Sequence, residues 1–172
     1  KGSPHKIFVS GKDQSRILID NLGWSKNDVK ITKSLRLKKK INKNISGSVF
    51  LPINLSNSKK IIYDFKKILK IKNEFKFPFL KVRNHPAMSK SNSHIYLTRM
   101  LENLILKYDT KSKYKSKKNI CIIIGPTSSV IEYLAKKFYI IHIPINPILD
   151  IYNSKIFSNI FTINKKNFYV YK

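Results

Sequence analysis

The sequence predicts an α/β fold in which a doubly wound, mostly parallel sheet is covered by helices on both faces. Two observations predict it. Short runs such as NICIII at 119–124 and FYIIHIPI at 138–145 are apolar on both faces, as buried parallel strands are. Between such runs lie longer stretches whose apolar residues recur at helical spacing. No fixed-period repeat or heptad pattern favours another architecture.

The first region is a β-α-β unit at residues 1–37. A strand is expected at 5–11, followed by a helix at 15–23 that ends in a glycine suited to a C-cap. The apolar alternation of VKITKSLR at 29–36 predicts the second strand. The basic stretch 38–47 has few apolar residues, and we interpret it as a domain junction.

The second region, residues 48–172, repeats the alternation. In chain order, the sequence predicts strand 48–53, helix 58–72, strand 77–84, helix 94–109, strand 119–124, helix 128–137 and strand 138–145. One helical face carries the apolar residues Ile61, Ile62, Phe65, Ile68 and Leu69, and the next helix places Leu97, Leu101, Leu104, Ile105 and Tyr108 in line. The tail after 153 is expected to hold a short strand or two.

Length and composition limit the protein class. A chain of 172 residues can bury a core without staples, and the single cysteine, Cys121, excludes an internal disulfide framework. Cys121 lies within an apolar run, so we expect a buried thiol. No apolar run reaches the roughly 20 residues that span a bilayer. We therefore expect a soluble, cytoplasmic protein, and because the chain begins KGSP without an initiator Met, a piece of something longer.

The formal charge of +26 would suggest a polyanion partner, yet only four of the 35 basic residues are arginine. Base readout and bidentate phosphate recognition favour arginine. Ile and Asn are abundant and Ala is nearly absent, which is the pattern of an AT-rich genome. We interpret much of the charge as compositional, and basic patches at 37–44 and 111–118 as loops.

Two loops should meet at the carboxyl edge of the sheet, where parallel α/β folds bind ligands. In GPTSSVIE, Gly125 and Pro126 turn the chain, and Thr127, Ser128 and Ser129 fall at the start of the next helix. Hydroxyls beside the unpaired N–H groups of a helix N-terminus favour a phosphate. A competing interpretation is a capping box between Ser129 and Glu132, which would satisfy the same N–H groups without a ligand.

The other loop is KVRNHPAM. His85 precedes Pro86, which biases it toward an extended conformation beyond the strand end. There it could donate to a phosphate or protonate a leaving oxygen. Lys81 and Arg83 share one side of the preceding strand, and two cations on a central strand would be costly without an anion. Either this strand lies nearer an edge or an anion binds there.

The remaining histidines carry little chemistry in this sequence. His142 alternates with apolar residues and is expected to be a hydrogen-bonded core residue, whereas His5 and His94 flank elements and look exposed. No pair of histidines has the spacing of helical metal ligands, so we expect no metal site and no cofactor.

These motifs together resemble the C-terminal nucleotide-binding half of the GT-B glycosyltransferases. More narrowly, the chain is similar to bacterial surface-carbohydrate biosynthesis proteins related to the sialyl- and polysialyltransferases and the CDP-glycerol glycerophosphotransferases. Residues 5–36 resemble the closing segment of the N-terminal half of that group, KVRNHPAM its His-Pro motif, and GPTSSVIEYLAKK its serine-pair motif.

The resemblance implies a Rossmann-like domain at 48–172, which binds a nucleotide-activated sugar or alditol. His85 would contact the donor phosphate as the catalytic group, with Ser128, Ser129 and Thr127 around it. Gly125, Arg83 and Glu132 complete the implied donor site, Glu132 reaching a ribose or base edge. Asp150, in the segment 147–153 that could close over the donor, is a weaker candidate because an Asp before a helix is usually a cap.

The implied activity is transfer to a glycan or lipid-linked acceptor in capsule or lipopolysaccharide assembly, peripheral to the inner face of the cytoplasmic membrane. The family's acidic general base lies in the N-terminal half, of which only the closing segment is present. Asp13, Asp20 and Asp28 do not form its acidic motif. We therefore expect donor binding without a complete catalytic site, and no nucleic-acid partner. A basic nucleic-acid-binding domain and a catalytically inactive GT-B domain stay open as alternatives.

Overall fold

The computed structural model describes residues 4–32, 45–71, 78–108, 119–126, 129–146, 160–165 and 167–172, with Tyr152 and Phe157. The chain separates into two compact units, one formed by 1–41 with 152–161 and the other by 42–151 with 162–172. The described residues Tyr152, Phe157, Ile160 and Phe161 therefore group with the first unit, whereas the sequence assigned all of 48–172 to one region.

The first unit contains the expected β-α-β arrangement. Strands β1 (Ile7–Val9) and β2 (Val29–Ile31) pair in parallel. Between them run helix α1 (Lys12–Arg16) and the π-helical turn η1 (Ile17–Asn21), so the helix begins three residues earlier than the spacing predicted. Gly23 follows with φ +71°, the left-handed conformation that ends a helix. That this unit belongs to a GT-B N-terminal domain stays a prediction.

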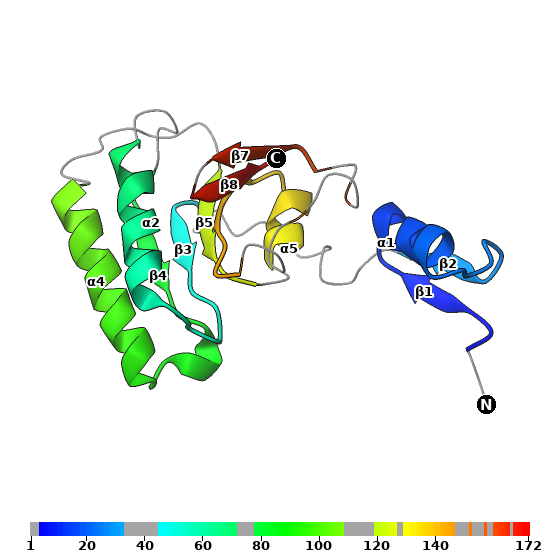
Figure 1. The fold of residues 1–172 in the computed structure, drawn as a ribbon, viewed down its shortest axis with the longest axis horizontal. Helices are drawn as coiled ribbons and strands as arrows, with labels where there is room; N and C mark the ends of the chain where they lie inside the picture. The colour runs from blue at the N-terminus through cyan, green and yellow to red at the C-terminus, as the bar shows by residue number, and fades with distance from the viewer. Residues whose placement is uncertain are drawn as a thin grey trace. The chain divides into compact units, whose positions relative to one another are not determined.

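The second unit is built on a six-stranded, mostly parallel sheet (Figure 1). Its strands are β3 (Ser48–Phe50), β4 (Lys81–Arg83), β5 (Ile120–Ile124), β6 (Tyr139–Ile143), β7 (Thr162–Lys165) and β8 (Phe168–Tyr171). Their spatial order is β4-β3-β5-β6-β8-β7. The first four strands are parallel, and β8 and β7 add an antiparallel hairpin beside β6. The expected α/β class is confirmed, and the sheet is compatible with a Rossmann-like fold.

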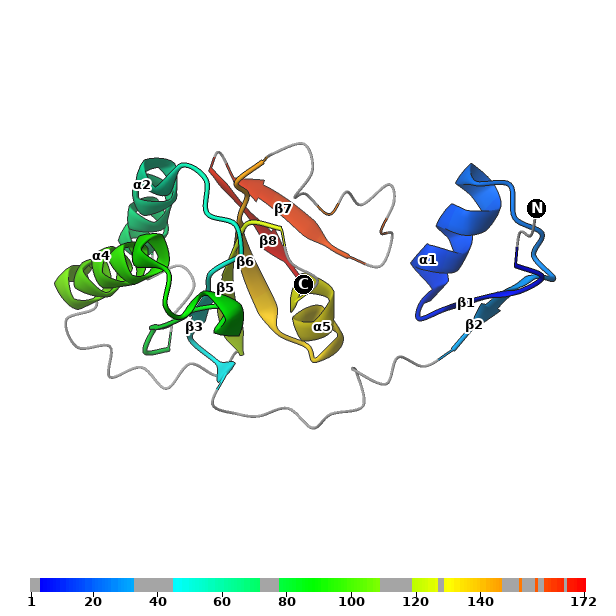
Figure 2. The ribbon, with the colours of Figure 1, turned by 90° about the horizontal axis from the view of Figure 1, so that it is seen from below.

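Helices cover both faces of this sheet. Helices α2 (Ser58–Lys70) and α4 (Asn92–Tyr108) lie side by side on one face, and the short helix α5 (Ser129–Ala135) lies on the other (Figures 1 and 2). A 3-10 turn, η4 (Pro86–Met88), precedes α4. Within the described residues, no helix is both long and apolar enough to cross a membrane.

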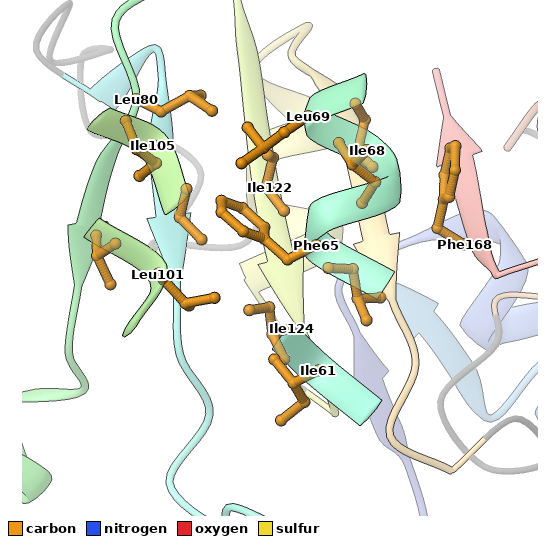
Figure 3. Packing of buried hydrophobic residues seen from close by; sticks show 14 of the residues in the cluster. Ile61, Phe65, Ile68, Leu69, Leu80, Leu101, Ile105, Ile122, Ile124 and Phe168 are labelled. Atoms are coloured by element: carbon orange, nitrogen blue, oxygen red, sulfur yellow. The ribbon is translucent and has the colours of Figure 1, made fainter. Parts of the chain in front are cut away.

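The core lies between the sheet and the α2–α4 layer (Figure 3). Phe65, Ile68 and Leu69 of α2 pack toward Ile122 and Ile124 of β5. The apolar helix faces expected from the spacing are therefore the buried ones. Alternate residues of the central strands, such as Cys121 and Ile123, are also buried, which explains why these runs are apolar on both sides.

Several elements are shorter than predicted. The expected strand 48–53 ends at Phe50, close to Pro52, which has no N–H to donate to a ladder. The expected strand 77–84 is β4, three residues long. Helix α5 ends at Ala135 because Lys137 adopts the left-handed conformation, with φ +61°. The N–H groups of Lys137 and Phe138 then bond to the carbonyls of Leu134 and Tyr133, a Schellman arrangement.

Candidate functional site

The two loops singled out in the sequence follow strands of the same sheet. Both β4 and β5 run parallel to β3, so the loops that begin at Asn84 and Gly125 leave the same carboxyl edge. Strand β3 lies between them, which separates the two strand ends by about 10 Å at the usual strand spacing. Thr127 and Ser128, like Asp150, lie outside the described residues.

His85 has the extended conformation expected before a proline, with φ −64° and ψ 134°. Its Nδ1 accepts a hydrogen bond from the Ala87 N–H at 3.2 Å and so caps the turn η4. Because Nδ1 is the acceptor, the neutral ring carries its proton on Nε2. Within the described part of the chain, that Nε2–H has no partner. The half-buried imidazole can therefore donate one hydrogen bond to a bound anion.

Gly125 makes a tight, buried turn at the end of β5, with φ +69°. Its N–H donates to the carbonyl of Ile143 at 2.8 Å. A Cβ at this position would meet the Ile145 side chain at 2.7 Å and the ring of Pro52 at 3.2 Å. Only glycine combines this conformation with this close approach, so the backbone before the hydroxyl loop is fixed in place.

A buried histidine holds the carbonyl of Gly125. His142 Nε2 lies 3.0 Å from that oxygen, and its Nδ1 lies 3.2 Å from the Tyr171 hydroxyl. Since a carbonyl only accepts, Nε2 carries the proton and Nδ1 accepts from Tyr171. The expectation that His142 is a hydrogen-bonded core residue is confirmed, because only 1% of it is exposed.

A second buried histidine holds the end of β3, and here the sequence prediction is wrong. His94 was expected to be exposed, but only 2% of it is accessible. Its Nε2 donates to the carbonyl of Pro52 at 2.9 Å, and its Nδ1 lies 3.2 Å from the Ser91 hydroxyl. One turn later on α4, the Thr98 hydroxyl donates to Asn84 Oδ1 at 2.8 Å, beside His85.

Helix α4 therefore holds the chain after β3 through His94 and the loop after β4 through Thr98, and sequence reasoning missed both contacts. A signal was available. His94 precedes Leu97 and Leu101 by three and seven residues, which places it in phase with the buried face of the helix. A histidine at such a position is buried and needs hydrogen-bond partners.

Lys81 and Arg83 lie on an edge strand, so no anion is needed to explain them. Lys81 is exposed, and the half-buried Arg83 donates from Nε to the Ser48 hydroxyl at 2.7 Å. Arg83 also acts on Tyr133, whose pKa is raised by burial and by the nearby Glu132 and Cys121, with the guanidinium opposing this. The positive charge thus lies on the α5 side of the sheet.

Glu132 lies in the first turn of α5 and pairs with Lys136, with 2.6 Å between Oε1 and Nζ. The capping box between Ser129 and Glu132 stays a prediction. Tyr133 of the same helix stacks on Phe50 of β3, with ring centroids 5.1 Å apart, which holds α5 on the sheet.

Two of the acidic residues considered in the sequence, Asp13 and Asp20, belong to the first unit, and Cys121 lies within β5. Asp13 pairs with Arg16 within α1 at 3.8 Å, and Asp20 is exposed. Burial raises the pKa of the Cys121 thiol well above its usual range, so this expected buried thiol is unreactive as a nucleophile. Among the described residues, no group of three His, Cys, Asp or Glu side chains could hold a metal ion.

Comparison of the chain with protein-family models, with curated proteins and with solved structures finds no match. The interpretation of the site therefore depends on the residues themselves and on the motifs that they form.

Proposed function

We propose that this chain is the donor-nucleotide-binding part of a glycosyltransferase, or of a related glycerophosphotransferase, in cell-surface polysaccharide assembly. The observation that carries the proposal is the Nε2–H of His85, which stands without a described partner at the carboxyl edge of a parallel sheet. Open α/β sheets bind ligands at this edge. The resemblance of KVRNHPAM and GPTSSVIEYLAKK to the His-Pro and serine-pair motifs supports the same assignment.

The chemistry follows from these residues. In sugar transfer, the bond between the anomeric carbon and the donor phosphate breaks, and its electron pair passes to the phosphate oxygen. His85 would donate its Nε2–H to that phosphate, and the hydroxyls of Thr127, Ser128 and Ser129 would bind its other oxygens. Gly125 sets the backbone of this loop, and Glu132 would meet the ribose or base only by leaving Lys136. By the resemblance, the residues that bind the acceptor and the general base would lie in an N-terminal GT-B domain.

Calorimetric titration with CMP, CDP and UDP tests the proposal. Wild-type protein should bind at least one nucleotide saturably, and His85→Ala should weaken that binding at least tenfold, since a hydrogen bond to a charged group contributes about 1.5–3 kcal/mol. His5→Ala is the matched control, because His5 is an exposed histidine in the other unit. Equal binding by wild type and His85→Ala would contradict the assignment.

A separate observation, the formal net charge of +26, supports one alternative function. A nucleic-acid-binding domain would bind DNA or RNA with steep salt dependence and would not distinguish free mononucleotides. Binding of neither nucleotides nor nucleic acids would favour a catalytically inactive structural domain. The same titrations, repeated with a short oligonucleotide, separate the three outcomes.

A further inference from the structure

The outer face of α2 carries a row of basic residues around a tyrosine. Lys59, Tyr63, Lys66 and Lys70 follow one another at intervals of four, three and four residues, which places them on one helical face. All four are exposed, and 56% of Tyr63 is accessible. We refer to these four residues as the α2 basic row.

Among the residues that the structure describes, no carboxylate pairs with the lysines of this row. The single acidic residue of α2, Asp64, is fully buried and faces the opposite way. Its Oδ2 binds Lys60 Nζ at 2.9 Å, and its Oδ1 accepts from Asn167 at 2.8 Å. Within the described ranges, Lys59, Lys66 and Lys70 have no anionic partner. Like charges four residues apart, such as Lys66 and Lys70, destabilise a helix by their repulsion. An external anion that covers this face would reduce that repulsion.

The neighbouring helix extends the same kind of surface. On α4, Tyr96 and Leu106 are exposed by 56% and 68%, and Arg99 is exposed between them. Glu102 is the exposed carboxylate of this helix. Helices α2 and α4 lie side by side as one layer over the sheet (Figures 1 and 2). The layer therefore presents ammonium groups together with partly apolar side chains to the solvent.

The surroundings of α2 decide which anionic partner this face fits. One side of the helix packs against α4, and the other is tied to the β7–β8 hairpin, where Lys67 Nζ and Asn167 Oδ1 lie 2.9 Å apart. A helix flanked on both sides does not enter a major groove about 12 Å wide. The row also consists of lysine, which acts as a point charge and makes no bidentate contact with bases. A planar anionic surface fits better than a duplex.

We propose that the α2 basic row binds the surface of an anionic lipid bilayer, with the lysines on headgroup phosphates and Tyr63 at the level of the interface. Tyrosine is enriched at membrane interfaces because its ring is apolar and its hydroxyl polar. Basic residues on a helix are attracted electrostatically to the headgroups of anionic lipids. This surface goes beyond the proposed nucleotide site and does not depend on it.

Sedimentation with lipid vesicles tests the proposal on the whole chain. The protein should bind vesicles made of equal parts phosphatidylcholine and phosphatidylglycerol, and should stay unbound with phosphatidylcholine alone. Because each lysine near an anionic surface raises affinity roughly fivefold, the triple variant K59Q/K66Q/K70Q should lower the partition coefficient by roughly a hundredfold. In high salt, where the lysine charges are screened, Tyr63→Ser should still lower the partition coefficient several-fold relative to wild type.

The matched control is K6Q/K12Q/K30Q, which removes the same charge from exposed lysines of the first unit. This control should retain most of the binding. Circular dichroism should show both variants folded, the α2 variant at least as stable as wild type because repulsion is relieved. An equal loss in both triple variants would show that net charge alone binds lipid and would overturn the proposal. An absence of vesicle binding by the wild-type protein would also overturn it. Tighter binding to a DNA duplex than to vesicles, lost in the α2 variant and kept in the control, would do the same.

Discussion

Replacement of His94 by leucine tests whether α4 anchors the carboxyl edge as the structure shows. Leucine is close to histidine in volume, so the variant removes hydrogen bonds without opening a large cavity. It leaves the buried Pro52 carbonyl without its donor at 2.9 Å, which costs about 1–3 kcal/mol, and it loses the bond to Ser91, about 1 kcal/mol. The expected total is about 3 kcal/mol of unfolding free energy.

Thermal unfolding followed by circular dichroism measures this loss. For a chain of this size, a change of about 3 kcal/mol lowers the melting temperature by about 6–12 °C. His94→Gln should recover more than half of the loss, because its amide can donate to Pro52. Arg99→Leu on the exposed side of the same helix should change the unfolding free energy by less than about 0.5 kcal/mol.

NMR spectroscopy measures the local effect of the same substitution. Because the ring of Pro52 lies against Gly125, the Gly125 amide resonance should shift in His94→Leu and stay in place in Arg99→Leu. The anchoring role of His94 is contradicted if its leucine and glutamine variants both melt within about a degree of wild type, or if the Gly125 resonance does not move in His94→Leu.

Two further predictions concern stability. Asp64→Ala removes the carboxylate that joins Lys60 to Asn167, and should cost about 2–3 kcal/mol in urea unfolding, whereas exposed Lys66→Ala should cost little; similar midpoints would show that the network contributes nothing. Burial raises the pKa of Cys121 in the folded protein above the value of about 8.5 for an unfolded chain. The contribution of the neutral thiol to the free energy of unfolding is therefore fully present below about pH 8.5 and is lost as the pH rises, by about 1 kcal/mol per pH unit. Cys121→Ala should flatten this decline, and parallel pH profiles for both proteins would contradict it.

Much of the candidate site was predictable because its signals are local. A proline fixes the conformation of the residue before it, so the extended backbone of His85 could be expected from Pro86. The alternation of apolar strands and helices likewise predicted that the loops after β4 and β5 leave one edge of the sheet. The position of the proton on the His85 ring could not be predicted, because it depends on the hydrogen bond that Nδ1 accepts from the Ala87 N–H.

Where the sequence was misleading, the deciding contact was distant. His94 was predicted to be exposed because it begins a helix, but its partner at Pro52 lies 42 residues earlier in the chain. The cost of two cations on the strand containing Lys81 and Arg83 depended on strand order, which no local pattern encodes. The structure places that strand at the edge.

The sequence by itself determined the α/β class, the phases of the buried helix faces and the glycine turn after β5, because each depends on residue spacing or on backbone sterics within a few residues. Only the tertiary structure decided the order of the strands, the burial of His94 and the antiparallel hairpin beside β6. Those features arise when segments far apart in the chain must satisfy one another's buried polar groups and hydrogen-bond ladders, and that requirement exists only in the folded state.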